Sequence, residues 1–411
     1  RSLVVSLGGM LCAAPMAALA QEDTINTGTT VVTATALKVD TPEVETPRAI
    51  STVSAEELET RGVNKYDETF QYRSGVVSQP YGEDNNTDWF FLRGFSAESA
   101  TYQDGLRLFR TGGYFWWMNE TFGVERVDLL KGPASILYGE APPGGVINAI
   151  SKRPTSEPQG TLKIEAGNQQ HRQVGIDVSG PVAERDDMRY RMVGLYRDGE
   201  GELNGSEKER YYFAPSLEMD VSDDTTVTFL ASVQKDEGVP TTGFFPALGT
   251  LNDSPFGQID PETNLGQPDY DRLDQRQVGI GYELEHQIND TWEFQQNARY
   301  THLDLELRNV YPNSFVTPPR SISRGVIDRA GEYDAFNIDN RLIARTYTDN
   351  TKNTLLLGAG YQELNLNYTN RDSFRTLGDG STFFANVDTV DLYNPDYAAF
   401  TAPVTGDPTQ H

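Results

Sequence analysis

The sequence predicts a small α+β domain followed by the first strands of a transmembrane antiparallel β-barrel. Residues 45–154 divide into short apolar segments separated by glycine and proline turns, which is typical of a compact domain with short strands. From residue 160 onward, strand-length segments alternate apolar and polar side chains. After residue 20 no run of about 18 apolar residues occurs, so we expect strands rather than helices to cross the membrane.

Residues 1–20 are predicted to be a secretory signal peptide. An apolar run over 3–20 ends in Ala-Leu-Ala and is followed by polar residues 21–23, the arrangement of a hydrophobic region and its cleavage site. A membrane anchor is the alternative, but the run is short for that role. Because no Met precedes Arg1 and the basic start is almost absent, we expect the first few residues to be missing. Cys12, the only cysteine, lies here, so we expect no disulfide in the mature chain.

The chain is strongly acidic and rich in residues that favour strands. Its 34 basic and 60 acidic residues give a formal net charge of −26, which argues against nucleic-acid binding and suits a surface exposed to salt water and cations. The 37 Gly, 20 Tyr and 19 Phe residues fit β-structure better than a helical bundle. We therefore expect no nucleic-acid partner.

Residues 21–44 form a polar, extended leader with one short β-prone island. The island consists of Thr30, Val31, Val32, Thr33 and Ala34. One interpretation is a disordered tail whose strand propensity has no role, and the other is a segment that a partner protein binds by strand addition. Its place between a cleavage site and a compact domain favours the second interpretation.

One helix and several short strands are predicted in residues 45–154. Ser54 and Glu57 form a capping box at the start of the helix. Short strands separated by glycine turns are expected at 75–77, 89–95, 102–107 and 124–129. The segment 125–154 adds a Lys-Gly-Pro turn and a Pro-Pro-Gly-Gly turn ahead of a second strand pattern, so we expect it to form a hairpin-rich unit.

About nine longer strands are predicted from residue 160 to the end. In Thr226–Val233, for example, the apolar Val227, Phe229, Ala231 and Val233 share one face, and the polar Thr226, Thr228 and Ser232 lie on the opposite face. The other segments lie near 161–167, 172–180, 188–198, 208–220, 278–284, 292–301, 334–348 and 353–368. A soluble sandwich would also alternate, but segments of about 9–11 residues with aromatics near their ends and a polar inner face favour a membrane barrel.

The connections between these segments are unequal in length. Tight turns are expected at 289–290 and 349–352, and long loops at 237–272 and 307–333. Short turns on one side and long loops on the other are typical of outer-membrane barrels. About nine strands do not close a barrel, because an open edge within lipid leaves backbone groups unpaired. We therefore expect the chain to be an N-terminal fragment.

The segment ERVDLLKGPASILYGEAPPGGVINAISKRP (125–154) closely resembles the end of the plug domain of TonB-dependent outer-membrane receptors, in particular ferric-siderophore receptors. LRGF at 92–95 and YQDGLRL at 102–108 stand in the order and spacing of the same domain. The resemblance implies a plug domain over 45–154 inside a 22-stranded barrel, of which residues 160–411 form the N-terminal part. It also implies the outer membrane of a Gram-negative bacterium, with lipid and lipopolysaccharide around the barrel.

By the same resemblance, Thr30–Ala34 is a TonB box. Such receptors offer this segment to the periplasmic protein TonB, which acts with an inner-membrane energising complex. Import of a ferric siderophore would then require no covalent chemistry and no cofactor, since loops capture the chelate and TonB pulls on the leader. Only about nine residues separate the cleavage site from the box, so no additional N-terminal signalling domain is expected.

Aromatic residues of the loops are predicted to line the siderophore site, because the resemblance places these loops around an external cavity. These residues are Tyr81, Tyr114, Phe115, Trp116, Trp117, Phe244, Phe245 and Tyr311. The alternative for each is packing in the plug core or against the barrel wall. Aromatic walls suit a bulky, partly apolar ferric hydroxamate of the ferrichrome or ferrioxamine kind. Arg107 and Arg110 lie nearby and could pair with an anionic chelate, so a ferric catecholate remains an alternative cargo.

Two arginines are candidates for a latch between plug and barrel. Arg93 and Arg126 lie on predicted plug strands, where an unpaired buried charge would be costly. Local pairing, for example with Asp104 or Asp128, is one interpretation. The resemblance implies the other, in which plug arginines pair with glutamates on later barrel strands.

We find no pattern of a catalytic site, and we expect no resident metal, because the siderophore itself holds the iron. The four histidines have no metal-ligand spacing, and neither a phosphate-binding loop nor a nucleophile elbow occurs. The alternatives are a TonB-dependent receptor for another cargo, such as a catecholate siderophore, cobalamin or a saccharide, and a surface binding protein that transports nothing. Deleting Thr30–Ala34 would abolish uptake by a transporter but leave binding intact. A passive porin is disfavoured, because a plug of about 110 residues would obstruct it.

Overall fold

The computed structural model describes most of the chain. The described residues are 3–6, 33–34, 38–39, 41–42, 49–97, 100–110, 113–139, 141–241, 243–315, 320–376, 382–384, 387–398, 400 and 409–410. Most of the predicted signal peptide and Thr30–Val32 of the predicted TonB box lie outside this part, so both remain predictions. No helix in the part that the structure describes is both long and apolar enough to cross a membrane.

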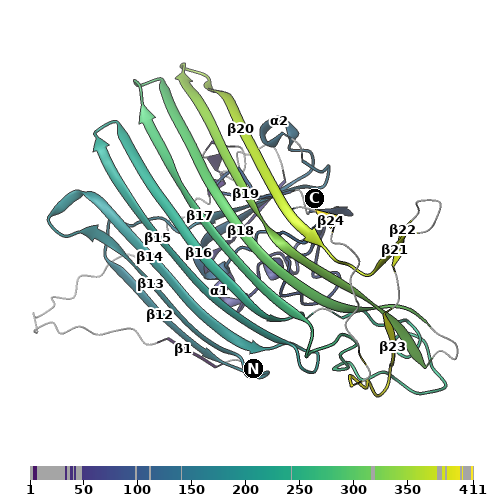
Figure 1. Cartoon of the computed structure of the whole chain (residues 1–411). Helices are drawn as coiled ribbons and strands as arrows, with labels where there is room; N and C mark the ends of the chain where they lie inside the picture. Colours follow the sequence, from purple (N-terminus) through teal and green to yellow (C-terminus); the bar gives the residue numbers. More distant parts are fainter. Residues whose placement is uncertain are drawn as a thin grey trace, which may run out of the picture.

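Nine long antiparallel strands form a curved wall, and a smaller domain lies against one face of it (Figure 1). The strands are β12 (Gln159–Ala166), β13 (Arg172–Val182), β14 (Arg185–Glu200), β15 (Glu207–Ser222), β16 (Thr225–Val239), β17 (Arg272–Gln287), β18 (Trp292–Phe315), β19 (Ser321–Tyr347) and β20 (Lys352–Asn370). Each pairs with the next in chain order, which is the up-and-down connectivity of an antiparallel barrel. The predicted fold class, a plug domain with the strands of a β-barrel, is therefore confirmed.

Shorter strands complete or extend this wall. They are β1 (Leu3–Ser6), which pairs with β12, β23 (Asp388–Asp391), which pairs with β19, and β24 (Thr409–Gln410), which pairs with β20. Two small hairpins lie outside it, β2 (Thr33–Ala34) with β3 (Thr41–Pro42), and β21 (Phe374–Thr376) with β22 (Thr382–Phe384).

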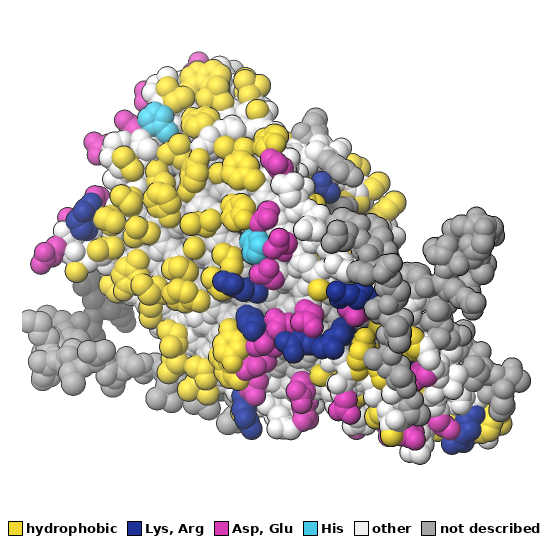
Figure 2. All heavy atoms as spheres, viewed as in Figure 1, with side chains coloured by type: hydrophobic (Ala, Val, Ile, Leu, Met, Phe, Trp, Pro, Cys, Tyr) yellow, Lys and Arg dark blue, Asp and Glu magenta, His cyan; other side chains and the backbone are white. Residues whose placement is uncertain are grey.

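The predicted alternation separates the two faces of the wall. Phe229, Val233 and Ile280 are exposed on the outer face, whereas Thr228 and Gln234 are buried on the face toward the plug. Figure 2 shows hydrophobic side chains gathered over the outer face on the side of the tight turns, and a band of charged side chains toward the long loops. This is the surface expected of strands that face lipid on one side.

Strands β14–β20 have 15 to 27 residues and are longer than the predicted 9–11 residues, and one predicted loop was wrong. Strands β18 and β19 stay paired as far as Phe315 and Ile322, so much of the expected loop at 307–333 is a strand hairpin. Val310 and Val326 on this hairpin are buried, and this apolar burial gives a reason for the pairing to continue. The loop expected at 237–272 is confirmed, since β16 ends at Val239 and β17 begins at Arg272.

The tight turn at Asn289-Asp290 has a local cause. The Oδ1 atom of Asn289 accepts hydrogen bonds from the backbone N–H groups of Thr291 (3.0 Å) and Trp292 (3.1 Å). Asn side chains favour such turns, because they satisfy backbone donors that a reversing chain leaves unpaired. The turn therefore needs few residues between β17 and β18.

The smaller domain, the plug, contains two sheets. The larger has the order β4 (Ile50–Ser54), β10 (Val124–Lys131), β11 (Gly145–Ser151), β8 (Thr101–Gln103) and β9 (Leu106–Arg107). The smaller consists of β5 (Val76–Ser78), β6 (Phe90–Leu92) and β7 (Phe95–Ser96). Its helical segments are α1 (Ala55–Thr60), η2 (Tyr66–Glu68), η3 (Thr121–Gly123) and α2 (Ser135–Tyr138). The predicted helix start is confirmed, because Ser54 Oγ accepts from the N–H of Glu57 at 3.2 Å.

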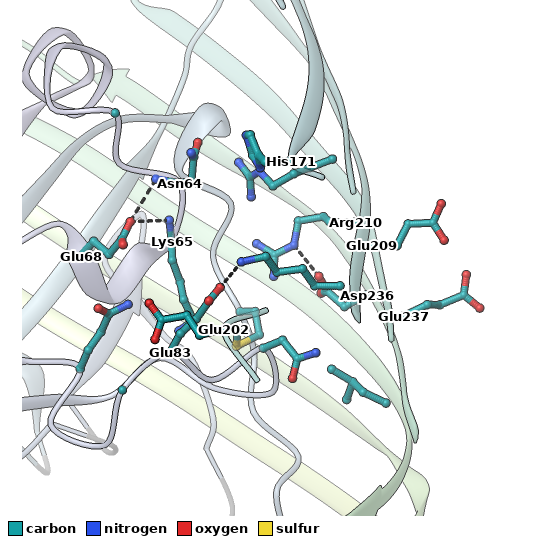
Figure 3. A pocket seen from close by; sticks show the side chains of 18 residues that line it. Asn64, Lys65, Glu68, Glu83, His171, Glu202, Glu209, Arg210, Asp236 and Glu237 are labelled. Carbon is teal, nitrogen blue, oxygen red and sulfur yellow. Dashed lines mark hydrogen bonds and ion pairs between the residues drawn. The ribbon is translucent and has the colours of Figure 1, made fainter. Parts of the chain in front are cut away.

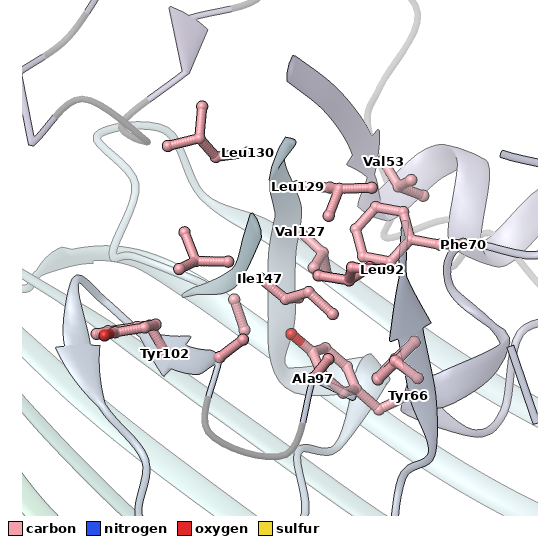
Figure 4. Close-up of a cluster of buried hydrophobic side chains, with 14 of the residues drawn as sticks. Val53, Tyr66, Phe70, Leu92, Ala97, Tyr102, Val127, Leu129, Leu130 and Ile147 are labelled. Carbon is pink, nitrogen blue, oxygen red and sulfur yellow. The ribbon is translucent and has the colours of Figure 1, made fainter. Parts of the chain in front are cut away.

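The plug has its own hydrophobic core (Figure 4). Val127 and Leu129 of β10 and Ile147 of β11 are completely buried in it. The predicted Pro-Pro-Gly-Gly turn needs its last glycines, because a Cβ on Gly144 would lie 2.1 Å from Leu92 O. A Cβ on Gly145 would lie 2.2 Å from Leu130 O. The turn therefore brings β11 close enough to pair with β10 along its whole length.

Candidate functional site

A cavity of about 520 Å³ lies where loops of the plug meet the long-loop side of the barrel wall. We call it the aromatic cavity. Its lining residues are Tyr81, Asp84, Asn86, Trp89 and Tyr114 of the plug and Pro240, Phe244, Leu307, Asn309, Tyr311, Pro312, Ile327, Arg329 and Asp372 of the barrel and its loops. A concave site with aromatic walls and a few polar groups is the usual form of a small-ligand site.

The aromatic rings of this cavity contact one another edge to face. Tyr81 has its ring centroid 5.1 Å from Trp89 and 5.9 Å from Phe244, so a plug loop and a barrel loop meet here. Trp116 packs behind them, 5.0 Å from Trp89 and 5.2 Å from Tyr114. Such packing holds the rings in fixed positions before any ligand arrives.

Charged groups of the cavity wall are engaged with protein partners. The carboxylate of Asp84 accepts a hydrogen bond from Trp89 Nε1 at 2.9 Å. Arg329 forms an ion pair with Asp372, and its guanidinium lies 4.9 Å from the centre of the Tyr114 ring. Arg329 is the only cation among the described lining residues, and Asp372 neutralises it. The cavity therefore offers aromatic surface rather than free positive charge.

The structure brings together half of the predicted ligand residues. Tyr81, Tyr114, Phe244 and Tyr311 line the aromatic cavity. Trp116 is buried behind its wall, as described above. The sequence reasoning missed Trp89, because it assigned this residue to a predicted strand at 89–95, whereas β6 begins at Phe90 and Trp89 lies in the loop before it.

The other three predicted residues pack elsewhere, two of them buried and one partly buried. Phe115 and Trp117 pack between plug and barrel wall, in a cluster with Leu273 and Leu303. Phe245 packs into a separate cluster of the outer loops. These three side chains therefore pack against other hydrophobic side chains, the alternative considered for each, and do not line the aromatic cavity. Sequence patterns could not show which of several neighbouring aromatic side chains face the cavity and which pack in the interface between plug and barrel.

Glu120 of the plug forms a buried ion cluster with the barrel wall. Its carboxylate oxygens lie 3.0 Å from Arg197 on β14 and 3.0 Å from Arg210 on β15. Burial alone would raise the pKa of the Glu120 carboxyl, but the two arginines outweigh it and lower the pKa to about 2. The plug therefore carries the negative member of this cluster and the barrel the positive members.

The second cluster joins the plug to strands β17 and β18. Arg153 lies 2.9 Å from Asp104 within the plug and 2.7 Å from Glu283 on β17. Arg299 on β18 also pairs with Asp104. Burial would raise the pKa of Asp104, but Arg153 and Arg299 hold it well below its usual range.

The predicted latch residues are placed differently from these clusters. Arg126 lies 3.5 Å from Asp128 on its own strand, which is the local pairing considered above. Arg93 is exposed at a turn with a positive φ of 50°. Their pairing with barrel glutamates remains a prediction. Sequence reasoning missed the two clusters, because their members are far apart in the chain and only the strand register brings them together.

A second cavity, of about 390 Å³, lies between the plug and strands β14–β16 (Figure 3). Its walls carry acids and bases that are largely paired with one another. Lys65 of the plug lies 2.6 Å from Asp67 and 2.9 Å from Asp88, and Lys208 of β15 pairs with Glu83. A polar, self-paired seam of this kind suits water better than a bulky apolar ligand.

One group among the described residues could hold a metal ion, and none of its residues lines the aromatic cavity. His302, Asp304 and Glu332 belong to β18 and β19, with their ligand atoms within 4.8 Å of one another. The His302 ring is already engaged, with Nδ1 2.8 Å from Asp334 and Nε2 3.2 Å from Asp304. The group contributes nothing to the lining of the aromatic cavity.

The leader contacts the barrel wall shortly after the predicted TonB box. Thr33 and Ala34 of the box form β2. Lys38 Nζ lies 3.0 Å from Asp339 on β19, and the Lys38 carbonyl accepts from Arg341 at 3.2 Å. This contact fixes the point at which the leader meets the wall.

Comparisons with known proteins agree with this architecture. The family profile described as TonB-dependent Receptor Plug Domain matches residues 42–146, and that described as TonB dependent receptor-like, beta-barrel matches residues 212–408. The ferrioxamine B receptor of Salmonella typhimurium strain SL1344 is 30% identical over 405 residues, which are 97% of this chain and 56% of that receptor. The ferrichrome outer membrane transporter/phage receptor of Escherichia coli K12 is 29% identical over 385 residues, 88% of this chain and 50% of that protein.

Solved structures show the same fold. Pseudomonas aeruginosa FpvA, bound to a heterologous pyoverdine and iron, superposes with a TM-score of 0.78 at 22% identity, covering 92% of this chain and 49% of that one. The closed form of the Escherichia coli ferric-catecholate import receptor Fiu gives 0.75 at 20% identity. The chain thus spans about half the length of the relatives it matches.

Proposed function

The chain belongs to the TonB-dependent receptor family, and from this premise we propose that its protein imports a ferric siderophore of the hydroxamate type. Receptors of this family lie in the outer membrane of Gram-negative bacteria, and so does this chain. They are receptors and not enzymes. The siderophore is cargo, and the family carries no resident cofactor.

The aromatic cavity is the observation that carries the choice of cargo. A ferric hydroxamate presents a bulky and partly apolar surface, which Tyr81, Trp89 and Phe244 can contact with little loss of conformational freedom. An anionic ferric catecholate would instead favour cations that are free to pair with it. The one cation among the described lining residues, Arg329, already has Asp372 as its counter-ion.

The names of the relatives support the same class. Relatives named for ferrioxamine B and ferrichrome align over 97% and 88% of this chain. The catecholate siderophore receptor Fiu of Escherichia coli O157:H7 aligns over 64% of it at 26% identity. The proposal rests first on the cavity and second on these relatives.

In the proposed cycle, cargo enters the aromatic cavity and contacts plug and barrel together. The leader then pairs with TonB through Thr30–Ala34 by strand addition. Force on the leader acts on the Lys38–Asp339 contact before it reaches the plug sheet, because Lys38 comes first along the chain. Energy for the movement comes from the inner-membrane complex, and no bond is made or broken.

Tryptophan fluorescence tests the proposal, because three of the four tryptophans lie in the plug. The complete receptor in detergent is titrated with ferrioxamine B, ferrichrome and a ferric tricatecholate. We expect sub-micromolar quenching by the hydroxamates only. Quenching by the catecholate alone would support a siderophore receptor but contradict the hydroxamate cargo. No quenching by any of the three chelates would favour cobalamin, a saccharide or another cargo.

Uptake separates a transporter from a binding protein. Cells that carry the receptor without residues 30–34 should bind ferric hydroxamate as before but accumulate no iron from it. Equal uptake with and without this segment would contradict the proposed role of the leader.

A further inference from the structure

Four polar side chains meet on the outer face of the wall, between strands β18 and β19. In the strand register His302 lies opposite Asp334, and Asp304 lies opposite Glu332. They share the face of Tyr300, which is 42% exposed, because alternate residues of a strand point the same way. The ligand atoms of His302, Asp304 and Glu332 lie within 4.8 Å of one another. One imidazole and two carboxylates therefore converge from two strands, and we call the four residues the outer-wall group.

Asp334 fixes the orientation and the tautomer of the His302 ring. The ring Nδ1 atom lies 2.8 Å from an Asp334 oxygen. Because an ionised carboxylate only accepts hydrogen bonds, Nδ1 carries the proton and donates it. The hydroxyl of Tyr300 donates to the same carboxylate and helps to hold it in place. A carboxylate that orients the ring in this way is the usual support of a metal-binding histidine, and it leaves Nε2 as the ligand atom.

The distance between His302 Nε2 and Asp304 fits two ligands of one metal ion. These atoms are 3.2 Å apart. Two ligand atoms that each lie about 2.0 Å from a tetrahedral zinc ion are about 3.3 Å apart. An unprotonated ring nitrogen and a carboxylate oxygen are both acceptors, so a proton or a cation has to lie between them.

The charges of the group favour a divalent cation in this place. Asp304 faces Glu332 directly across the strands, where like charges destabilise a sheet. Arg276 of β17 faces Asp304 from the other side, whereas neutral asparagines of β20 face Glu332 and Asp334. Three carboxylates against one arginine leave two negative charges within this group, and a divalent cation would neutralise both.

We propose that the outer-wall group binds a divalent transition-metal ion of the Zn²⁺ kind. His302 Nε2 and the carboxylates of Asp304 and Glu332 are its ligands, and Asp334 is a positioning residue. Imidazole and carboxylate ligands suit Zn²⁺. The ion joins β18 to β19 and stabilises the wall, and it takes no part in moving the cargo. The site lies outside the aromatic cavity, so the inference goes beyond the proposed function and does not depend on it.

Zinc binding to the complete receptor tests this inference. The receptor, without an affinity tag and freed of metals with a chelator, is titrated with Zn²⁺ in detergent by calorimetry. We expect Glu332→Gln to bind Zn²⁺ at this site about tenfold or more weakly. His171→Gln is the matched control, because His171 also lies beside a carboxylate, 3.6 Å from Glu165, but belongs to no group of three possible ligands in the described chain. It should bind Zn²⁺ like the unmodified receptor.

Thermal unfolding separates loss of a ligand from loss of structure. Zn²⁺ should raise the thermal midpoint of the unmodified receptor and of H171Q, because it binds the folded state, but should not raise that of E332Q. Without Zn²⁺ the midpoint of E332Q should be equal or higher, since a like-charge pair is removed. Asp304→Asn, a second variant of the same pair, should behave in the same way.

The inference is wrong if the unmodified receptor and E332Q bind the same amount of Zn²⁺ at every concentration. It is also wrong if Zn²⁺ leaves the midpoint of the unmodified receptor unchanged, and a proton then lies between His302 and Asp304. Lower midpoints of both E332Q and D304N without Zn²⁺ would assign the two residues a structural role and would overturn the inference as well. Binding of ferrioxamine B, measured on the same samples, should be equal in all four proteins, and its absence from all of them would contradict only the proposed function.

Discussion

The carboxylate of Glu120 lies 3.0 Å from the guanidinium of Arg210, and this contact joins the plug to the barrel wall across 90 residues of sequence. Arg197 completes the cluster from the neighbouring strand at the same distance. All three side chains are largely buried, so the charges interact in surroundings where water screens them weakly. Removing one member therefore leaves the others without their counter-charge.

Glu120→Gln should destabilise the attachment of the plug. Breaking a buried ion pair costs about 3–5 kcal/mol, because the remaining charges stay buried. We expect a lower midpoint of thermal unfolding, followed by tryptophan fluorescence of the complete receptor. Arg185→Gln is the control, because the Arg185–Asp187 pair is exposed and its loss should leave the midpoint unchanged. Equal midpoints for E120Q and the unmodified receptor would show that the cluster does not hold the plug.

The same cluster predicts how plug stability depends on pH. The folded-state pKa of Glu120 is lowered to about 2 from an ordinary value of 4.5. A lowered carboxyl pKa adds stability that is fully present above about pH 4.5 and is lost as the pH falls toward 2. Thermal midpoints measured from pH 7 to pH 3 should fall below about pH 4.5, and they should fall less steeply in E120Q. An identical slope in both proteins would assign the acid sensitivity to other carboxyls.

Aromatic residues of the cavity wall and of the interface should respond differently to truncation. Trp89→Ala should weaken ferric hydroxamate binding about tenfold or more, because a central aromatic contact is lost. Phe115→Ala should instead destabilise the plug by about 3–5 kcal/mol through a cavity in the interface. Titration and thermal unfolding of both variants check this pair. If F115A binds ferric hydroxamate much more weakly but unfolds at the same temperature, Phe115 contacts the ligand and the prediction is wrong.

Asp372→Asn should change the preference for cargo charge. The substitution removes the carboxylate that neutralises Arg329 at the cavity wall. We expect the ratio of affinities to shift about tenfold toward a ferric tricatecholate, because a cation now faces the anionic chelate. Asp391→Asn serves as the control, since Asp391 pairs with Arg320 outside the cavity lining. An unchanged ratio in D372N would mean that charge at Arg329 does not select the cargo.

Lys38→Met should loosen the leader. The variant keeps the length of the side chain but loses the ion pair with Asp339, which is mostly shielded from solvent. Limited proteolysis should cleave the leader several-fold faster in the variant than in the unmodified receptor. Lys352→Met, which changes an exposed lysine at the start of β20, should leave the rate unchanged. Equal rates in all three proteins would show that Lys38 does not hold the leader.

Local sequence patterns predicted the fold well, because each strand carries its own evidence. The alternation around Phe229 and Val233 fixes which face is exposed, and the cap at Ser54 marks where the helix begins. The continued pairing of β18 with β19 as far as Phe315 and Ile322 was missed, because the extension packs against loop residues such as Leu265, whose positions the sequence does not give. Periodicity predicts a strand but not where pairing stops.

The site was predicted only in part, for a related reason. Consecutive aromatic residues such as Phe115 and Trp116 look alike in the sequence, but Phe115 packs in the cluster between plug and barrel and Trp116 packs against Trp89 of the cavity wall. The ion clusters of Glu120 and Asp104 depend on the register between plug and wall, which no local pattern contains.

The place of β4 in the plug sheet decides how force from the leader would be distributed. Among the described strands, β4 pairs with β10 alone and forms the edge of the sheet, and its first pair is Ile50 with Leu130. Tension that enters at Ile50 loads one end of this ladder, so its hydrogen bonds can fail in sequence rather than all together. Glu120 and Asp104 lie further along the chain and anchor the remainder to the wall. In the proposed cycle, β4 would therefore leave the sheet first, while the ion pairs of Glu120 and Asp104 hold the rest of the plug to the wall.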